Sequence, residues 1–182
     1  MKLTENYKLQ VNALLANAKK QIPTAFSEAA VSNALGILES TPSALKEISS
    51  NISEEGFAEP IIPGKRSFKE TLHHFLNIEA LNYVTIYPAL LIEKPKVYGL
   101  HAERDLGKLR LYEDFTRDEL LTSFELERRK TLNFLKALKK GDWLRQIIEG
   151  GKSRQETIYW RTRALALHDY THLLILRFQL EL

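Results

Sequence analysis

Residues 166–177 read ALHDYTHLLILR, a segment in which two histidines stand among apolar residues. His168 and His172 are four residues apart, which on an α-helix places both imidazoles on one face, one turn apart. Two imidazoles at that spacing can bind a single metal ion. The apolar residues around them recur at helical spacing, so we expect a helix over about residues 157–180. Its inner stripe comprises Ala164, Leu165, His168, His172, Ile175 and Leu176.

A second stretch, residues 63–75, reads PGKRSFKETLHHF and predicts the start of another helix. Ser67 followed three residues later by Glu70 is the pattern of a capping box, in which two side chains satisfy backbone N–H groups at a helix N-terminus. The helix that follows carries His73 and His74. A third imidazole from this helix would complete a three-histidine site with open coordination positions, the arrangement of metal sites that do chemistry.

Helical periodicity also runs through the rest of the chain. A first helix is expected to end near Pro23, and a second helical stretch covers about residues 27–51, with a kink or a break at Pro42. The histidine-bearing helix is expected to bend near Pro88. A further capping box predicts another helix over about residues 116–140, which stops at a glycine.

No stretch shows the sustained alternation of a strand or a tight hairpin turn, so we expect no sheet. Residues 95–115 are expected to form a long connection, and Gly150-Gly151 a turn. Four long amphipathic helices bury their apolar stripes most simply as a four-helix bundle. The prediction is an all-α fold with an additional N-terminal helix, divided into an N-terminal helical extension (1–27) and a four-helix bundle domain (28–182).

Composition narrows the function classes. The chain has 182 residues, 44% of them hydrophobic and 27% charged, and a net charge of only +3, which argues against nucleic acid or an anionic membrane surface as partner. The longest apolar run, residues 83–92, is about half of the ~20 residues needed to span a bilayer. There is no cysteine, so a metal must be held by nitrogen and oxygen. We expect a cytoplasmic protein that is neither secreted nor membrane-inserted.

Residues 38–79, LESTPSALKEISSNISEEGFAEPIIPGKRSFKETLHHFLNIE, followed downstream by ALHDYTHLLILR, resemble the DinB/YfiT-like superfamily over roughly residues 28–180. The resemblance implies a four-helix bundle in which His74, His168 and His172 bind a divalent metal. It also implies possible homodimers. Characterised members of the superfamily include bacillithiol- or mycothiol-dependent transferases and isomerases, and others are described as metal-dependent hydrolases.

Three positions depart from the usual pattern of that superfamily. Arg66 stands where a Trp is usual, Asn77 where an Asp is common, and Thr171 where an extra His often precedes the last ligand. None of these departures removes a ligand. Asn77 lies one turn from His74 and can orient a ligand or contact substrate, but an amide cannot serve as a general base.

The sequence leaves open which histidine of the pair at 73 and 74 faces inward. Adjacent helical residues point about 100° apart, so both cannot bind one ion. The apolar stripe through Leu72, Leu76 and Tyr83 lies nearer His73, whereas the resemblance favours His74. We take His74 as the ligand.

Other residues have competing interpretations. Arg161 is either a charge that reaches water near the bundle end or an anion clamp beside the metal. Glu70 is a candidate general base that also has a sufficient structural role in its capping box. We therefore name Glu70, Asn77 and Arg161 as weak catalytic candidates. We expect His101 on the surface, Trp143 and Trp160 in packing roles, and the charge-rich residues 126–140 as a solvated helix face.

Neutral imidazoles without thiolates suit Zn²⁺ or Ni²⁺, with Fe²⁺ or Mn²⁺ binding more weakly. The first hypothesis is a metal-dependent enzyme, either a hydrolase or an S-transferase that uses a low-molecular-weight thiol, acting on a small molecule. The alternative is a non-catalytic bundle that binds a metal or a small ligand. A third interpretation is a bare bundle whose histidines are incidental, since such pairs are often satisfied by carbonyl groups or water.

Overall fold

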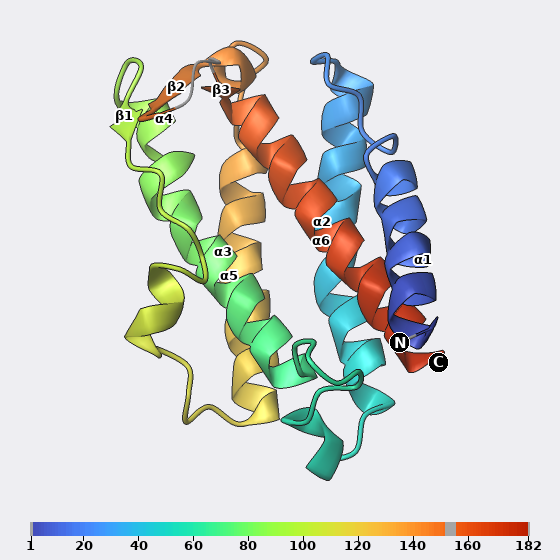
Figure 1. Ribbon diagram of the computed structural model, residues 1–182. Coiled ribbons are helices and arrows are strands. Elements are labelled where there is room, and N and C mark those ends of the chain that lie inside the picture. Colours follow the sequence, from blue (N-terminus) through green and yellow to red (C-terminus); the bar gives the residue numbers. More distant parts are fainter. Residues whose placement is uncertain (1, 152–155, 182) are drawn as a thin grey trace.

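The computed structural model describes residues 2–151 and 156–181, with side chains from Tyr7 onward. Four long helices form a bundle (Figure 1), and they are α2 (Glu28–Ser50), α3 (Phe68–Thr85), α5 (Arg117–Lys136) and α6 (Ile158–Leu180). The remaining long helix, α1 (Lys2–Ala18), lies outside this bundle, along α6. The predicted four-helix bundle with an additional N-terminal helix is therefore confirmed.

Capping side chains explain where the four bundle helices begin, and at α6 the Thr157 hydroxyl accepts a hydrogen bond from the Trp160 N–H. Ser27 Oγ accepts a hydrogen bond from the Ala30 N–H at 3.1 Å, which starts α2. At α3, Ser67 and Glu70 each accept a hydrogen bond from the other's backbone N–H. Thr116 and the Glu three residues after it do the same at α5. Both predicted capping boxes are present, and each satisfies N–H groups that a helix leaves unpaired at its start.

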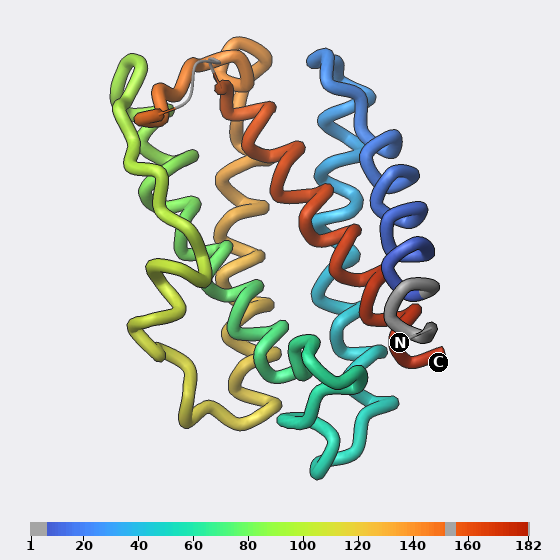
Figure 2. Tube along the Cα trace, in the orientation of Figure 1, coloured from blue at the N-terminus to red at the C-terminus, as the bar shows by residue number. Residues whose placement is uncertain are grey.

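The four helices do not surround the core equally. Helix α3 packs against α5, α5 against α2, and α2 against α6, whereas α3 and α6 approach each other much less closely. The tube in Figure 2 shows α3 and α6 both slanting across the view and staying apart along their length. The side of the bundle between α3 and α6 is consequently the open one.

The core consists of two apolar halves with a polar layer between them. Along each bundle helix, the buried polar residues of this layer lie between positions that belong to one apolar half and positions that belong to the other. On α2, for example, Leu38 belongs to one half, Leu45 to the other, and Thr41 lies between them. The corresponding buried polar residues on the other helices are Glu79 and Asn82 on α3, Arg128 and Thr131 on α5, and Asp169 on α6.

Helix α2 continues through Pro42, so the alternative of a break at this residue is wrong. A proline inside a helix lacks the N–H that would bind the carbonyl four residues earlier. Here that carbonyl belongs to Leu38, and it instead accepts a hydrogen bond from Nη1 of Arg128 on α5 at 3.2 Å. A side chain from a neighbouring helix thus replaces the missing backbone donor.

The expectation that the chain contains no sheet is also wrong. Three short strands, β1 (Lys96–Val97), β2 (Gln146–Glu149) and β3 (Glu156–Thr157), form a small sheet at one end of the bundle (Figure 1). β1 pairs with β2 in parallel, with Lys96 opposite Ile148, and β2 pairs with β3 antiparallel. Strands of two to four residues are too short to show alternation in the sequence.

Several helix ends differ from the prediction. Helix α3 ends at Thr85 and a separate short helix, α4 (Pro88–Leu91), begins at the proline, which suits the first turn of a helix. Helix α5 ends at Lys136, before the expected residue 140. Three short 3₁₀ helices, η1 (Glu55–Phe57), η2 (Leu106–Leu109) and η3 (Asp142–Leu144), lie in the connections. In the described part of the chain, no helix has the length and apolar character to cross a membrane.

Helix α1 is attached to α6 by specific contacts. The Tyr7 ring stacks on Phe178 with 5.7 Å between ring centroids, and Gln179 Nε2 donates a hydrogen bond to the Tyr7 hydroxyl at 2.8 Å. Arg163 Nε donates to the Ile22 carbonyl at 2.9 Å, just after α1. The division into an extension at residues 1–27 and a domain at residues 28–182 stays a prediction.

Candidate metal centre

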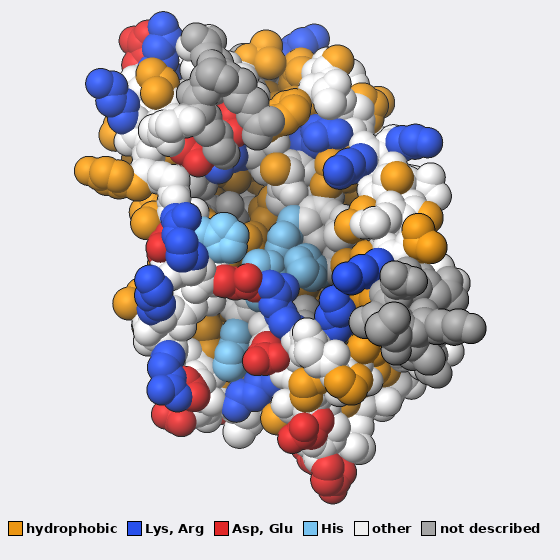
Figure 3. Space-filling view, viewed as in Figure 1, with side chains coloured by type: hydrophobic (Ala, Val, Ile, Leu, Met, Phe, Trp, Pro, Cys, Tyr) orange, Lys and Arg blue, Asp and Glu red, His pale blue; other side chains and the backbone are white. Residues whose placement is uncertain are grey.

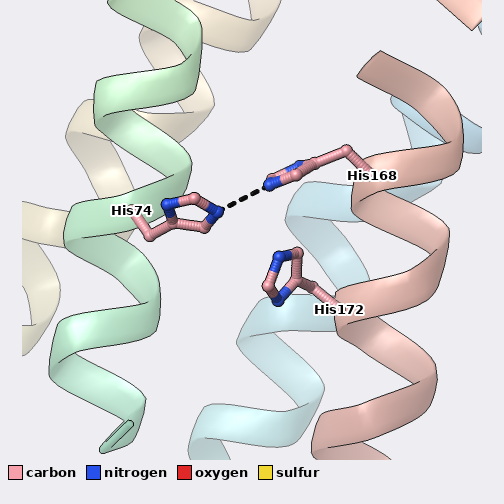
Figure 4. Close-up of side chains that lie close together, drawn as sticks. All are labelled: His74, His168 and His172. Carbon is pink, nitrogen blue, oxygen red and sulfur yellow. Dashed lines mark hydrogen bonds between the residues drawn. The ribbon is translucent and has the colours of Figure 1, made fainter. Parts of the chain in front are cut away.

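Three imidazoles converge on the open side of the bundle. His74 projects from α3 and the other two, His168 and His172, project from α6, and all three rings point toward one another (Figure 4). The Nε2 atoms of His74 and His168 are 2.7 Å apart. One nitrogen from each of the three residues lies within 4.8 Å of the others. Residues 94 positions apart thus form one cluster of nitrogen donors.

The surface places this cluster in a hollow. Figure 3 shows histidine side chains gathered at the centre of the face between α3 and α6, where the surface is concave. Each of the three histidines borders a different cavity among those found in the described structure, with volumes of about 300 Å³ at His74, about 260 Å³ at His168 and about 320 Å³ at His172. The cluster is therefore largely buried yet reachable by small molecules.

Burial keeps two of the imidazoles neutral. Loss of hydration, followed by the charge of His168, lowers the pKa of His74 to about 2. The same two causes, in the same order, lower the pKa of His172 to about 3. A metal binds only the neutral ring, whose nitrogen has a free lone pair. At neutral pH these two rings are accordingly ready to bind a cation without first losing a proton.

The Nε2 atoms of His74 and His168 have nearly the spacing of two ligands of one metal ion. Zn–N bonds are about 2.0–2.1 Å long, so two ligands of a tetrahedral ion have their nitrogens about 3.3 Å apart. The two Nε2 atoms, at 2.7 Å, need only move apart by a few tenths of an ångström each. Since the side between α3 and α6 is the loosely packed one, rotation of the imidazoles can supply this movement.

Behind His168 stands a buried carboxylate. Asp169 Oδ1 lies 3.1 Å from His168 Nδ1, and the Asp169 side chain is fully buried. Burial alone would raise the pKa of Asp169, but the charge of Arg128 and the contact with His168 outweigh it and lower that pKa. An ionised carboxylate can only accept a hydrogen bond, so His168 carries its proton on Nδ1 and presents the lone pair of Nε2 to the cluster.

Arg128 holds this carboxylate in place. Its guanidinium is 1% exposed, lies 2.5 Å from Asp169 Oδ2 through Nη1, and donates through Nε to Glu79 Oε1 at 2.6 Å. Glu79 Oε2 in turn accepts hydrogen bonds from Thr131 Oγ1 at 2.6 Å and from Asn82 Nδ2 at 3.1 Å. Apart from Thr41, whose hydroxyl donates to the Ile37 carbonyl, the polar layer of the core is therefore one connected network that ends at His168.

A second carboxylate, that of Glu103, lies next to His74. The Nδ1 atom of His74 is buried, has no hydrogen-bond partner among the described residues, and lies 3.4 Å from Glu103 Oε1. Because His168 Nε2 has no proton, His74 Nε2 is the donor in the contact between the two rings. An ion bound at Nε2 would shift that proton to Nδ1, where Glu103 can accept it. The unpartnered nitrogen is thus an observation that fits a metal ion.

The sequence profile of the DinB superfamily matches residues 37–176. The chain belongs to the DinB superfamily. Among solved structures it is similar to YfiT from Bacillus subtilis, with a TM-score of 0.75 and 14% identity over 86% of this chain and 89% of that one. YfiT is described as a probable metal-dependent hydrolase with an unusual four-helix bundle topology. A search of curated proteins finds no match.

The structure of this DinB-superfamily chain separates the two adjacent histidines. His74 joins the cluster, whereas the His73 ring lies against Tyr112, with 6.3 Å between ring centroids. The apolar stripe pointed to the wrong ring because α3 is buried on two sides, one against α5 and one toward α6. The resemblance to the superfamily therefore selected the ring that faces the cluster.

The three weak catalytic candidates lie in different surroundings. Asn77 is buried and borders the same cavity as His74, and Glu70 lies on that cavity while serving in the capping box. Arg161 is paired with Glu149 and Glu156 beside the sheet. Its guanidinium is therefore held by two carboxylates, and the choice between a charge that reaches water and an anion clamp stays open.

The expectations for Trp143 and His101 are confirmed, whereas the expectation for residues 126–140 is wrong. Trp143 is buried in the core, and His101 is exposed, with Nδ1 accepting a hydrogen bond from the Glu103 N–H. Residues 126–140 are not simply a solvated helix face, because Arg128 is among the most deeply buried side chains described. Its position on the stripe with Phe124, Thr131 and Leu135 was the signal in the sequence, since that stripe faces the core.

Proposed function

We propose that this chain is a metal-dependent enzyme in which His74, His168 and His172 hold one divalent ion, Zn²⁺ or Ni²⁺. The observation that carries the proposal is the convergence of three imidazoles beside open cavities, with carboxylates next to two of them. Three protein ligands leave coordination positions open, as in catalytic rather than purely structural sites. When bound, such an ion acts as a Lewis acid that activates water or a thiol.

The residues around the site support a small nucleophile that arrives with the substrate. In the described part of the site no carboxylate is free to act as a general base: Glu70 is held in its capping box, and Glu103 is paired with Arg66. Asn77 is an amide and cannot take up a proton. A thiol needs less help from a base than water does, because its pKa is already near 8.5. The candidate reactions are hydrolysis and thiol-dependent S-transfer, and this feature favours S-transfer.

The substrate on this proposal is a small molecule, because the cavities beside the histidines measure only about 260–320 Å³. A homodimer is part of the proposal by analogy with the superfamily. The alternative is a binding protein in which the same three imidazoles sequester a metal ion without turnover.

The test is a pair of assays on chain loaded with Zn²⁺ or Ni²⁺. One assay follows hydrolysis of small esters and amides, and the other follows consumption of small thiols in the presence of electrophilic acceptors. We expect metal-dependent turnover in one of them, lost in His168→Ala and retained in His73→Ala. Stoichiometric metal binding without turnover in either assay would support the binding protein instead.

A further inference from the structure

One cavity beside the cluster differs in character from the others. It lies between α3 and α6, next to His168, and has a volume of about 260 Å³. Apolar side chains from both helices and from the segment before η2 line most of it, namely Ile78, Leu81, Ile86, Leu100, Ala164 and Leu165. In the view of Figure 3 the surface is hollowed beside the histidines on this face.

The cavity at His74 is the more polar of the two. Arg66, Glu70, Asn77 and Glu103 line it together with His74. An ion at the cluster would accordingly be bound by one histidine that borders the more polar cavity and by another that borders the apolar one. A ligand that binds the ion can place a polar end and an apolar end in different surroundings.

Polar groups in the wall of the apolar cavity already have partners. Asn82 Nδ2 donates to Glu79 Oε2 at 3.1 Å, and Thr85 Oγ1 donates to the Leu81 carbonyl at 2.6 Å. Arg161, at the sheet end of the cavity, is paired with two carboxylates. A charged ligand group placed here would lose its hydration without gaining a new partner, whereas an apolar group would gain from leaving water.

We infer that this cavity holds the uncharged, apolar part of the substrate while the reacting atom lies at the ion. This inference rests on the proposed function and specifies its substrate class: a molecule with an aliphatic or aromatic group next to its reacting atom. An engineered apolar cavity of about 150 Å³ accommodates benzene, so about 260 Å³ accommodates a group of roughly ten carbon atoms.

The test uses straight-chain hydroxamates of increasing length, which bind a metal through the hydroxamate and carry an alkyl tail. Binding to the Co²⁺-loaded chain is followed by the visible spectrum of the ion. Each buried methylene is worth a factor of about four in affinity, so the dissociation constant should fall by about that factor per methylene until the cavity is filled.

Two matched variants test whether the alkyl tail of the hydroxamate lies in this cavity. Ala164 and Ala29 are both exposed helical alanines, but only Ala164 borders the cavity. Ala164→Phe should leave the affinity for acetohydroxamate unchanged and abolish the gain with chain length, whereas Ala29→Phe should behave like the native chain.

Three other outcomes would refute the inference or the proposed function. Acetohydroxamate binding without any gain from longer tails would refute the apolar cavity as a ligand site and leave the proposed function standing. A gain that persists in Ala164→Phe would place the tail elsewhere and also refute the inference. A chain that binds no Co²⁺ would refute the proposed function, and the inference with it.

Discussion

The Asp169 carboxylate lies 3.1 Å from Nδ1 of His168, the ring whose Nε2 lies 2.7 Å from His74. Because Arg128 keeps this carboxylate ionised, the contact fixes where His168 carries its proton. The lone pair of Nε2 then points at the cluster. A single buried residue, adjacent to a histidine in the sequence, thus connects the core of the bundle to the candidate metal site.

Replacing Asp169 by Asn tests this connection. The amide has nearly the same shape but can donate to His168 Nδ1, which would favour the tautomer with its proton on Nε2. Loss of a carboxylate behind a histidine ligand typically lowers metal affinity by about 10- to 100-fold. We expect a loss of that size in Asp169→Asn, measured by competition with a chromophoric chelator at a temperature where circular dichroism shows a folded chain. Native affinity in this variant would contradict the role of Asp169.

Arg128 and Arg129 provide a matched pair for the buried network. Arg128→Leu would leave the carboxylates of Glu79 and Asp169 buried without their cation, and breaking a buried pair in this way costs about 3–5 kcal/mol. Arg129 is exposed, so Arg129→Leu should leave the free energy of unfolding almost unchanged. Urea unfolding of the two variants makes the comparison. Similar stabilities would show that the network contributes little.

The metal-free chain should lose stability as the pH falls below neutral. The folded-state pKa values of about 2 for His74 and about 3 for His172 lie below the value of about 6.5 expected in the unfolded chain. Below pH 6.5 the unfolded chain therefore binds protons that the folded chain does not, and the equilibrium shifts toward unfolding. At pH 5 the loss is about 2 kcal/mol for each histidine.

Urea unfolding at pH 7, 6 and 5 in the presence of a chelator measures this loss. Replacing His172 by Gln removes one of the two groups and should reduce the pH dependence by about half. Equal free energies of unfolding at pH 7 and pH 5 in the native chain would show that the imidazoles are not held neutral by burial.

Glu70 can be tested separately as a cap and as a base. Gln also serves at this position of a capping box, so Glu70→Gln should keep the stability of the chain. Since the structure assigns Glu70 to the cap, we expect this variant to keep its turnover as well. Glu119→Gln, in the other capping box, is the control for the effect of the substitution itself. A large loss of turnover in Glu70→Gln alone would identify Glu70 as a base.

Local patterns in the sequence were enough to predict most of the fold. The capping boxes at Ser67 and Thr116 gave correct helix starts because their partners lie only three residues away. The small sheet was missed because its longest strand, β2, has only four residues and one of its two partners, β1, lies far away in the sequence. Pro42 was read as a possible break because its compensation, the contact of Arg128 with the Leu38 carbonyl, joins residues 90 positions apart.

In the candidate site, too, features set by neighbouring residues were predicted, and features set by residues distant in the sequence were missed. The spacing of His168 and His172 is a local feature, and the sequence predicted that both share one helix face. The carboxylates behind the histidines were missed, although Asp169 directly follows His168. Nothing local marks Asp169 as buried, because its burial depends on Arg128 from another helix. Glu103 lies in a long connection whose path over α3 the periodicity does not specify.

The most direct test of the central claim is the metal content of four proteins purified without an affinity tag or chelator: the native chain, His74→Ala, His168→Ala and His73→Ala. His73 is the matched control, since it neighbours His74 but points toward Tyr112. We expect about one divalent ion per chain in the native protein and in His73→Ala, and almost none in the other two variants. Metal content that is unchanged in His74→Ala and His168→Ala, or lost in His73→Ala alone, would contradict the three-histidine site.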